Sequence, residues 1–236
     1  MRPLWAESLP ELRGDLVVVR EVVEADAPTL YEMVSCPRVT AYMSPPPPSV
    51  HAFRGFVAWA QRERSLGHGA CFGIVAPGLT KAVGLIQLRA QEPSWFTAQW
   101  GFAIGEPFWA TGAFFDAAQL VVSFAFEHMH VHRLEARSTI NNGRGNGLLQ
   151  KLGARPEGAL ASALAKDGRY NAQFLWALHV NSWRQRPLLP RRFSVEEARA
   201  SIAAAAEETT RVLREQRVEQ SRGDLPPLYP FFVSES

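Results

Sequence analysis

The sequence has few cysteines, little net charge and no long apolar run. Only two cysteines occur among the 236 residues, Cys36 and Cys71, and their separation matches neither a metal motif nor a disulfide framework. No run of about 18 apolar residues is present, which argues against a transmembrane helix. The formal net charge of +2 is too small to predict general nucleic-acid binding. We therefore expect a cytoplasmic protein with unpaired thiols that binds neither membranes nor nucleic acid.

The remaining composition is that of a folded protein with an appendage. Hydrophobic residues make up 47% of the chain and charged residues 20%, which predicts a packed core rather than disorder. The composition changes at Arg184, where a Pro/Arg-rich linker begins. Beyond it, Ser194 and Glu197 form a capping-box pattern for an amphipathic helix, and a Pro/aromatic tail follows. We expect a domain over residues 1–183 and an appended segment over residues 184–236.

Hydrophobic periodicity and turn residues predict alternating strands and helices. Asp26 and Ser49 are expected to cap the first two helices, and residues 141–147 to form a Gly/Asn-rich turn. The predicted strands are 16–20, 70–75, 82–89, 95–104, 132–138, 158–164 and 170–180, the last two joined by a hairpin turn at 167–168. The predicted helices are 28–35, 49–64, 113–128, 148–152 and 194–218.

One strand–turn–helix segment, residues 95–126, carries a chemical signal. An aromatic-rich strand runs into a turn containing Gly105, Pro107 and Gly112, and a long apolar helix follows. The first backbone N–H groups of a helix have no intrahelical acceptor, and the helix dipole adds partial positive charge there. This segment therefore predicts an anion site suited to a phosphate-bearing cofactor.

In its context, this segment resembles the GCN5-related N-acetyltransferase (GNAT) family, in particular its RimJ/RimL-like branch. The resemblance extends from about Leu12 to Trp183 and rests on pieces in the same order and at similar separations. They are YMSPPPPSVHAFRGFVAW, AVGLIQLR, TAQWGFAIGEPFWATG, VHRLEAR, Asn142 followed by Lys151–Leu152–Gly153, and Pro156–Glu157–Gly158. The resemblance implies a mixed α/β (α+β) fold whose twisted sheet is split between its fourth and fifth strands.

The resemblance also implies acetyl-CoA as cosubstrate, held in that split without a metal. The backbone of the fourth strand, at Phe102, Ala103 and Ile104, would pair with the pantetheine arm, and Asn142 would contact the same arm. The pyrophosphate loop would consist of Trp109, Ala110, Thr111, Gly112, Ala113 and Phe114. Backbone N–H groups suit a pyrophosphate, and Gly112 allows a close approach that a Cβ would obstruct.

The chain departs from the family pattern at the usual acid and base positions. Gln99 stands where the Rim-like branch often has a glutamate, and an amide cannot act as a base. Gly145 replaces a serine that many relatives have three residues after the asparagine. Leu149 occupies the position of a tyrosine acid in other GNAT enzymes.

Three residues are candidates to replace the missing catalytic groups. Glu135 in the fifth strand is a candidate base, with an ion pair to Arg133 or Arg137 as the alternative. Tyr170 is a candidate acid, with a half-exposed strand tyrosine as the alternative, and Asn146 is a candidate to orient a water. Gln99 and Trp100 are candidate substrate contacts, and burial of the nearby aromatic residues in the core is the alternative. The three histidines at 128, 130 and 132 are expected to be surface residues, not metal ligands.

Two functional hypotheses follow from the resemblance and its departures. The first is an acetyl-CoA-dependent N-acetyltransferase acting on the primary amine of a protein N-terminus, a peptide or a small molecule. The second is an acyl-CoA-binding sensor or interaction protein in which catalysis is impaired. We expect the apolar end of the tail to dock on the domain; pairing of two copies into a homodimer, or covering of the acceptor groove, is the alternative.

Overall fold

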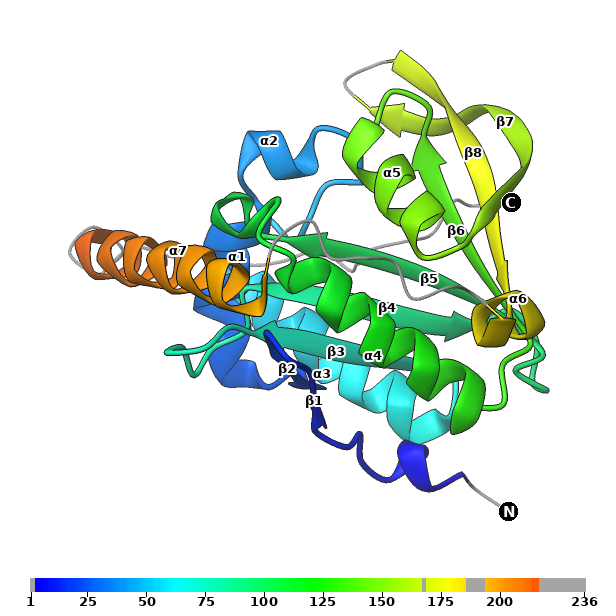
Figure 1. Cartoon of the computed structure of the whole chain (residues 1–236), viewed down its shortest axis with the longest axis horizontal. Helices are drawn as coiled ribbons and strands as arrows, with labels where there is room; N and C mark the ends of the chain where they lie inside the picture. The colour runs from blue at the N-terminus through cyan, green and yellow to red at the C-terminus, as the bar shows by residue number, and fades with distance from the viewer. Residues whose placement is uncertain (1–2, 167–168, 186–193, 217–236) are drawn as a thin grey trace.

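The computed structural model describes residues 3–166, 169–185 and 194–216. Its centre is an eight-stranded mixed sheet with helices on both faces (Figure 1). The strand order is β1-β2-β3-β4-β5-β6-β8-β7. The strands are β1 (Leu12–Arg13), β2 (Val18–Glu21), β3 (Gly69–Val75), β4 (Gly84–Ala90), β5 (Thr97–Ile104), β6 (Arg133–Thr139), β7 (Arg155–Lys166) and β8 (Arg169–His179).

The sheet opens between β5 and β6, the only parallel pair among the described strands. Their pairing covers only Thr97–Gln99 opposite Arg133–Glu135, whereas β4 pairs with β5 as far as Ile104. Beyond Gln99 the two strands therefore diverge. The split predicted between the fourth and fifth strands is confirmed, and those strands are numbered β5 and β6 because the short strand β1 precedes them.

Helices cover both faces of the sheet. They are α1 (Ala27–Val34), α2 (Pro37–Thr40), α3 (Val50–Leu66), α4 (Ala113–Glu127), α5 (Gly143–Lys151), α6 (Val180–Gln185) and α7 (Val195–Gln216), with 3₁₀ turns at η1 (Leu4–Ala6), η2 (Glu24–Asp26) and η3 (Glu106–Phe108). In Figure 1, α4 crosses in front of β3–β5 and α3 lies behind them. Phe72 of β3 packs on Phe124 of α4, with ring centroids 5.4 Å apart. Alternation along a strand then directs Cys71 to the opposite face, which α3 covers.

The long helix α3 confirms its sequence signals. The Ser49 hydroxyl accepts a hydrogen bond from the Ala52 N–H at 3.1 Å, as an N-cap does. The helix buries Phe53, Phe56 and Val57 at helical spacing. It ends at Gly67, whose φ of 79° is readily adopted only by glycine.

The appended helix α7 packs on the domain rather than standing alone. Ser194 and Glu197 form the predicted capping box, since each backbone N–H donates to the other side chain. Ile202 is fully buried in the common core, and the helix lies against η3. Arg199 donates to the Asp15 carbonyl at 3.0 Å. Docking of this helix is therefore observed, while the aromatic residues at 229–232 lie outside the described residues.

The structure corrects several local predictions. Asp26 is the N-cap residue of α1, as predicted, but its side chain accepts no hydrogen bond from that helix. Its carboxylate accepts instead from Arg20 and from the N–H groups of Val23 and Ala82. The predicted turn at 141–147 is mostly the first part of α5, which begins at Gly143. The short elements β1, α2 and α6 were not predicted. The predicted hairpin turn at 167–168 lies outside the described residues.

Candidate active site

The free edge of β5 forms one wall of the split. The Gly105 N–H donates to the Val83 carbonyl at 2.9 Å, and the Gln91 N–H donates to the Thr97 carbonyl at 3.0 Å. In an antiparallel pair, alternate residues bond to the same neighbour, so Ala103 also bonds toward β4. The backbone groups of Trp100 and Phe102 must then face the split. Of the three residues predicted to pair with pantetheine, Phe102 and Ile104 thus direct their backbone there, and the Ile104 carbonyl already accepts from the Trp109 indole at 3.2 Å.

The loop between β5 and α4 turns sharply at two positions with positive φ. Ala110 has a φ of 61°, and Gly112, at the N-cap of α4, has a φ of 88°. The Thr111 hydroxyl accepts from the Ala113 N–H at 3.2 Å and donates to the Phe108 carbonyl at 2.9 Å. This bonding fixes the loop and leaves other first-turn N–H groups of α4 for an anion. The geometry suits the pyrophosphate cradle that the sequence predicts.

Aromatic side chains line the split on the face that carries α4. Phe102 and Phe114 are both half-buried, with ring centroids 4.8 Å apart. Their rings offer an apolar wall beside the polar loop. Trp100, a predicted substrate contact, is only 3% exposed and packs against Phe102 at 5.0 Å. Its side chain is therefore covered by the protein itself.

The other side of the split is formed by β6 and the start of α5. Asn142 is the N-cap of α5, and its Oδ1 accepts from the Gly145 N–H at 3.0 Å. The Asn146 side chain, a candidate to orient a water, holds α5 to the sheet. Its amide nitrogen donates to the carbonyls of Thr139 and Ile140, and its oxygen accepts from the Trp176 indole at 2.9 Å.

The candidate base Glu135 lies at the closed end of the split, on the face that carries α3. It is opposite Gln99 in the β5–β6 register. Its carboxylate accepts from Arg133 at 2.7 Å and from Gln91 at 2.8 Å, so the ion pair considered as the alternative is present. Arg133 also pairs with Glu157, whose pKa falls to about 2 because of that hydrogen bond. The candidate acid Tyr170 is 73% exposed on β8, which is separated from β5 by β6.

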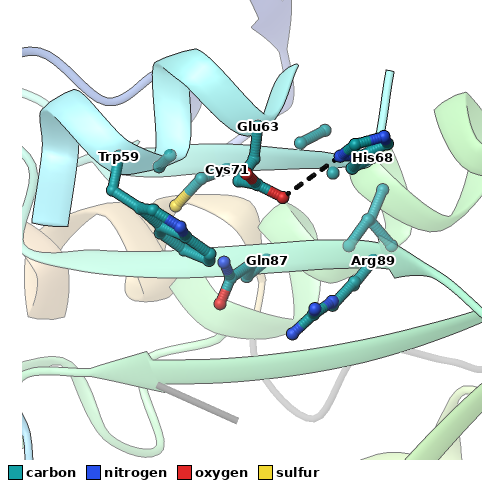
Figure 2. A pocket seen from close by; sticks show the side chains of 10 residues that line it. Trp59, Glu63, His68, Cys71, Gln87 and Arg89 are labelled. Carbon is teal, nitrogen blue, oxygen red and sulfur yellow. Dashed lines mark ion pairs between the residues drawn. The ribbon is translucent and has the colours of Figure 1, made fainter. Parts of the chain in front are cut away.

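A small pocket on the α3 face was not predicted from the sequence (Figure 2). Glu63 of α3 and His68 face each other there, with Oε2 and Nδ1 3.5 Å apart. The strand below contributes Gln87 and Arg89. Burial raises the pKa of the Cys71 thiol in the same pocket, which keeps it protonated and unreactive. The pocket joins segments that become neighbours only through the strand register, so sequence spacing gave no signal for it.

The pocket adjoins β5, because Gln87 is opposite Gly101 and Arg89 is opposite Gln99. Gln99 and Gly101 are half-buried on this same face. The split can thus be approached from two sides: the loop, α4 and α5 lie on one face, and Gln99, Glu135 and the pocket lie on the other. This arrangement suits a reaction in which two molecules meet at one gap in a sheet.

Comparison with known proteins agrees with this geometry. The family model for the acetyltransferase (GNAT) domain matches residues 17–155, more than half of the chain. The chain belongs to the GNAT family. It is an N-acetyltransferase, and GNAT enzymes use acetyl-CoA.

Two bacterial N-acetyltransferases are similar to this chain in sequence. The uncharacterized N-acetyltransferase YoaA of Bacillus subtilis is 26% identical over 164 residues, which span 67% of this chain and 90% of YoaA. The [ribosomal protein uS5]-alanine N-acetyltransferase of Escherichia coli is 26% identical over 118 residues, which span 50% of this chain and 61% of that enzyme.

Solved structures share the fold. The Mycobacterium smegmatis RimJ complex with CoA-disulfide aligns with a TM-score of 0.67 and 20% identity, over 87% of this chain and 98% of that chain. The RimL ribosomal L7/L12 alpha-N-protein acetyltransferase aligns with a TM-score of 0.66 and 17% identity, over 72% of this chain and 94% of that chain.

Two further observations concern membranes and metals. Among the described residues, no helix is both long enough and apolar enough to cross a membrane. No group of three or more His, Cys, Asp or Glu side chains is arranged to hold a metal ion in the described ranges. His128, His130 and His132 are exposed, and the His132 ring stacks on Phe96 at 4.5 Å.

Proposed function

We propose that this chain transfers the acetyl group of acetyl-CoA to the α-amino group of a protein or peptide N-terminus. The observation that carries the proposal is the divergence of β5 from β6 beyond Gln99, with the turn at Gly112 beside it. A free strand edge and a helix N-terminus together suit an extended arm that ends in a pyrophosphate. Acetyl-CoA has this form, and it supplies the acetyl group as a thioester that a neutral amine can attack.

The residues of the split would each perform a limited task. Phe102 would direct its backbone N–H to the oxygen that becomes negatively charged, and Asn142 would hold the pantetheine arm. The amine would approach across the α3 face, where the Gln99 amide can accept one of its N–H hydrogens. A C–N bond then forms as the C–S bond breaks. The amine loses one proton, and the departing thiolate takes up one proton.

An α-amino acceptor is consistent with Gln99 at the position where a glutamate base was expected. An α-amino group has a pKa of about 8, so a useful fraction is neutral at pH 7, whereas a lysine has a pKa of about 10.4. Gln99 cannot remove a proton, and Glu135 is engaged by Arg133. Proximity and oxyanion stabilisation then supply most of the rate enhancement. The uS5-alanine enzyme and the L7/L12 alpha-N enzyme act on ribosomal proteins by their names, which supports the same class of acceptor here.

The test is release of free thiol from acetyl-CoA with matched peptides. Each peptide is supplied with a free N-terminus and with a blocked N-terminus, and both forms contain one lysine. Small-molecule amines form a third arm. The proposal predicts thiol release only with free N-termini. Release with blocked peptides or only with small amines would contradict the α-amino acceptor.

A second candidate function is an acyl-CoA-binding protein without turnover. The engaged carboxylate of Glu135 and the amide at Gln99 favour it. Calorimetric binding of acetyl-CoA without thiol release for any acceptor in the panel would select this function over catalysis.

A further inference from the structure

Ser138 on β6 has a buried hydroxyl that the chain itself leaves unused. Its side chain is 6% exposed, and within the described residues its Oγ has no hydrogen-bond partner. A buried hydroxyl without a partner has lost its bonds to water and has gained none in return. Where such a group also lies beside a proposed binding site, a bound ligand can supply the missing partner.

Ser138 lies on β6 beside the split. It lies three residues beyond Glu135, the last β6 residue that pairs with β5. Strand alternation puts its side chain on the opposite face from Glu135, the face that carries α5. A Cβ built on Gly145, in the first turn of α5, would be 3.1 Å from Ser138 Oγ and 2.6 Å from Asn142 Nδ2. The Ser138 hydroxyl and the Asn142 amide therefore both lie close to the Cβ position of Gly145.

Gly145 is also the position at which the family resemblance implies a serine. In this chain a side chain at that position would meet Ser138 Oγ and Asn142 Nδ2, so the space is already filled. A hydroxyl is thus present in almost the same volume, but β6 supplies it instead of α5.

We propose that Ser138 hydrogen-bonds the pantetheine–thioester end of acetyl-CoA beside Asn142, in place of the side chain absent at Gly145. The inference rests on the proposed function, because it needs acetyl-CoA in the split. A hydroxyl can donate to the sulfur or to an amide carbonyl of pantetheine, and it can accept from an amide N–H. The Ser138 oxygen is covered by the protein, so the proposal requires the first turn of α5, at Gly143–Gly145, to move as the arm enters.

The test compares Ser138→Ala with Ser35→Ala by calorimetric titration of acetyl-CoA. Ser35 is the matched control, since it is the other buried, unpartnered side-chain hydroxyl among the described residues and lies at the C-cap of α1. We expect Ser138→Ala to weaken acetyl-CoA binding about fivefold, the worth of one net hydrogen bond, and Ser35→Ala to leave it unchanged. Melting curves check that both variants fold. Ser138→Cys has a similar volume and a weaker donor, so its acetyl-CoA affinity is a second test of the hydrogen bond.

A rescue variant separates this role from simple packing. Gly145→Ser alone should weaken binding, because its Cβ would meet Asn142 Nδ2 at 2.6 Å and Ser138 Oγ at 3.1 Å. The double variant Ser138→Ala/Gly145→Ser relieves only the second contact, so it should bind acetyl-CoA more tightly than Gly145→Ser but more weakly than the wild type. Unchanged affinity in Ser138→Ala and Ser138→Cys, equal losses in Ser138→Ala and Ser35→Ala, or no rescue would overturn the inference alone. Absence of acetyl-CoA binding by the wild-type chain would instead overturn the proposed function with it.

Discussion

The guanidinium carbon of Arg144 lies 3.6 Å from the ring centroid of Trp109. Trp109 belongs to the loop that precedes α4, and Arg144 belongs to the first turn of α5. The two residues thus come from opposite sides of the split. A cation over an indole face is an attractive contact, so this pair links the two walls near the predicted pyrophosphate position. Arg38, which pairs with Glu106, lies 5.6 Å from the same ring.

Arg144 should assist acetyl-CoA binding through its positive charge. The side chain is exposed beside the loop, and the phosphates of acetyl-CoA carry several negative charges. We expect Arg144→Ala to weaken acetyl-CoA binding by about threefold to tenfold at low salt, and by less at high salt. Arg211→Ala, on the exposed face of α7, should have no effect. A loss that does not depend on salt would argue against a charge effect.

Gly112 should be required for the loop conformation. Its φ of 88° is costly for other residues, and a Cβ there would lie 3.2 Å from Leu16 Cδ1. We expect Gly112→Ala to cost about 1–2 kcal/mol of unfolding free energy and to raise KM for acetyl-CoA. Gly78→Ala is the matched control, since its φ is 80° and no atom lies near its Cβ position. Equal changes in KM for the two variants would contradict a specific role of Gly112 in the site.

The Arg133–Glu157 pair predicts a dependence of stability on acid pH. The hydrogen bond from Arg133 lowers the pKa of Glu157 from 4.5 to about 2. Its stabilising contribution is therefore complete above about pH 4.5 and is lost as the pH falls toward 2. Melting temperatures of wild type and Glu157→Gln should differ most near neutral pH and converge toward pH 2. A difference that stays constant across this range would contradict the pairing, and Glu208→Gln in α7 serves as an exposed control.

The sequence was sufficient for the elements with strong local signals. The capped helix α3 and the capping box of α7 follow from side chains that bond to nearby backbone, so they could be predicted. The role of Asp26 could not, because its partner N–H of Ala82 is 56 residues away. The helical start of α5 was missed because Gly143, Gly145 and Gly147 disfavour helix locally. The Asn142 cap and the burial of Leu149 overcome that preference.

The candidate site could be predicted only where backbone geometry defines it. The turn at Gly112 follows from the strand–turn–helix pattern, and the family resemblance implies the free edge of β5. The pocket containing Glu63, His68 and Arg89 depends on strand register, which the sequence does not show directly. The proposed role of Ser138 also depends on a tertiary contact, because Ser138 and Gly145 meet only when α5 packs on β6.

The appended helix α7 should contribute to the stability of the domain. Ile202 is fully buried, and the Thr209 hydroxyl lies 3.8 Å from Met33 Sδ in α1. We expect Ile202→Ala to lower the unfolding free energy by about 2–4 kcal/mol, and Ala203→Ser on the exposed face to change it little. Thermal melting measures this loss, and sedimentation tests for a dimer. Unchanged melting together with a loss of dimer would show that the helix serves pairing instead of docking.

The most direct test of the account is a crystal structure of the chain with acetyl-CoA. We predict that the pantetheine arm lies between β5 and β6 and pairs with the backbone of Phe102. The pyrophosphate should lie at the N–H groups around Gly112 and Phe114, with the thioester close to Gln99. Acetyl-CoA bound away from the split, or a split filled by the protein's own side chains in the complex, would contradict the account.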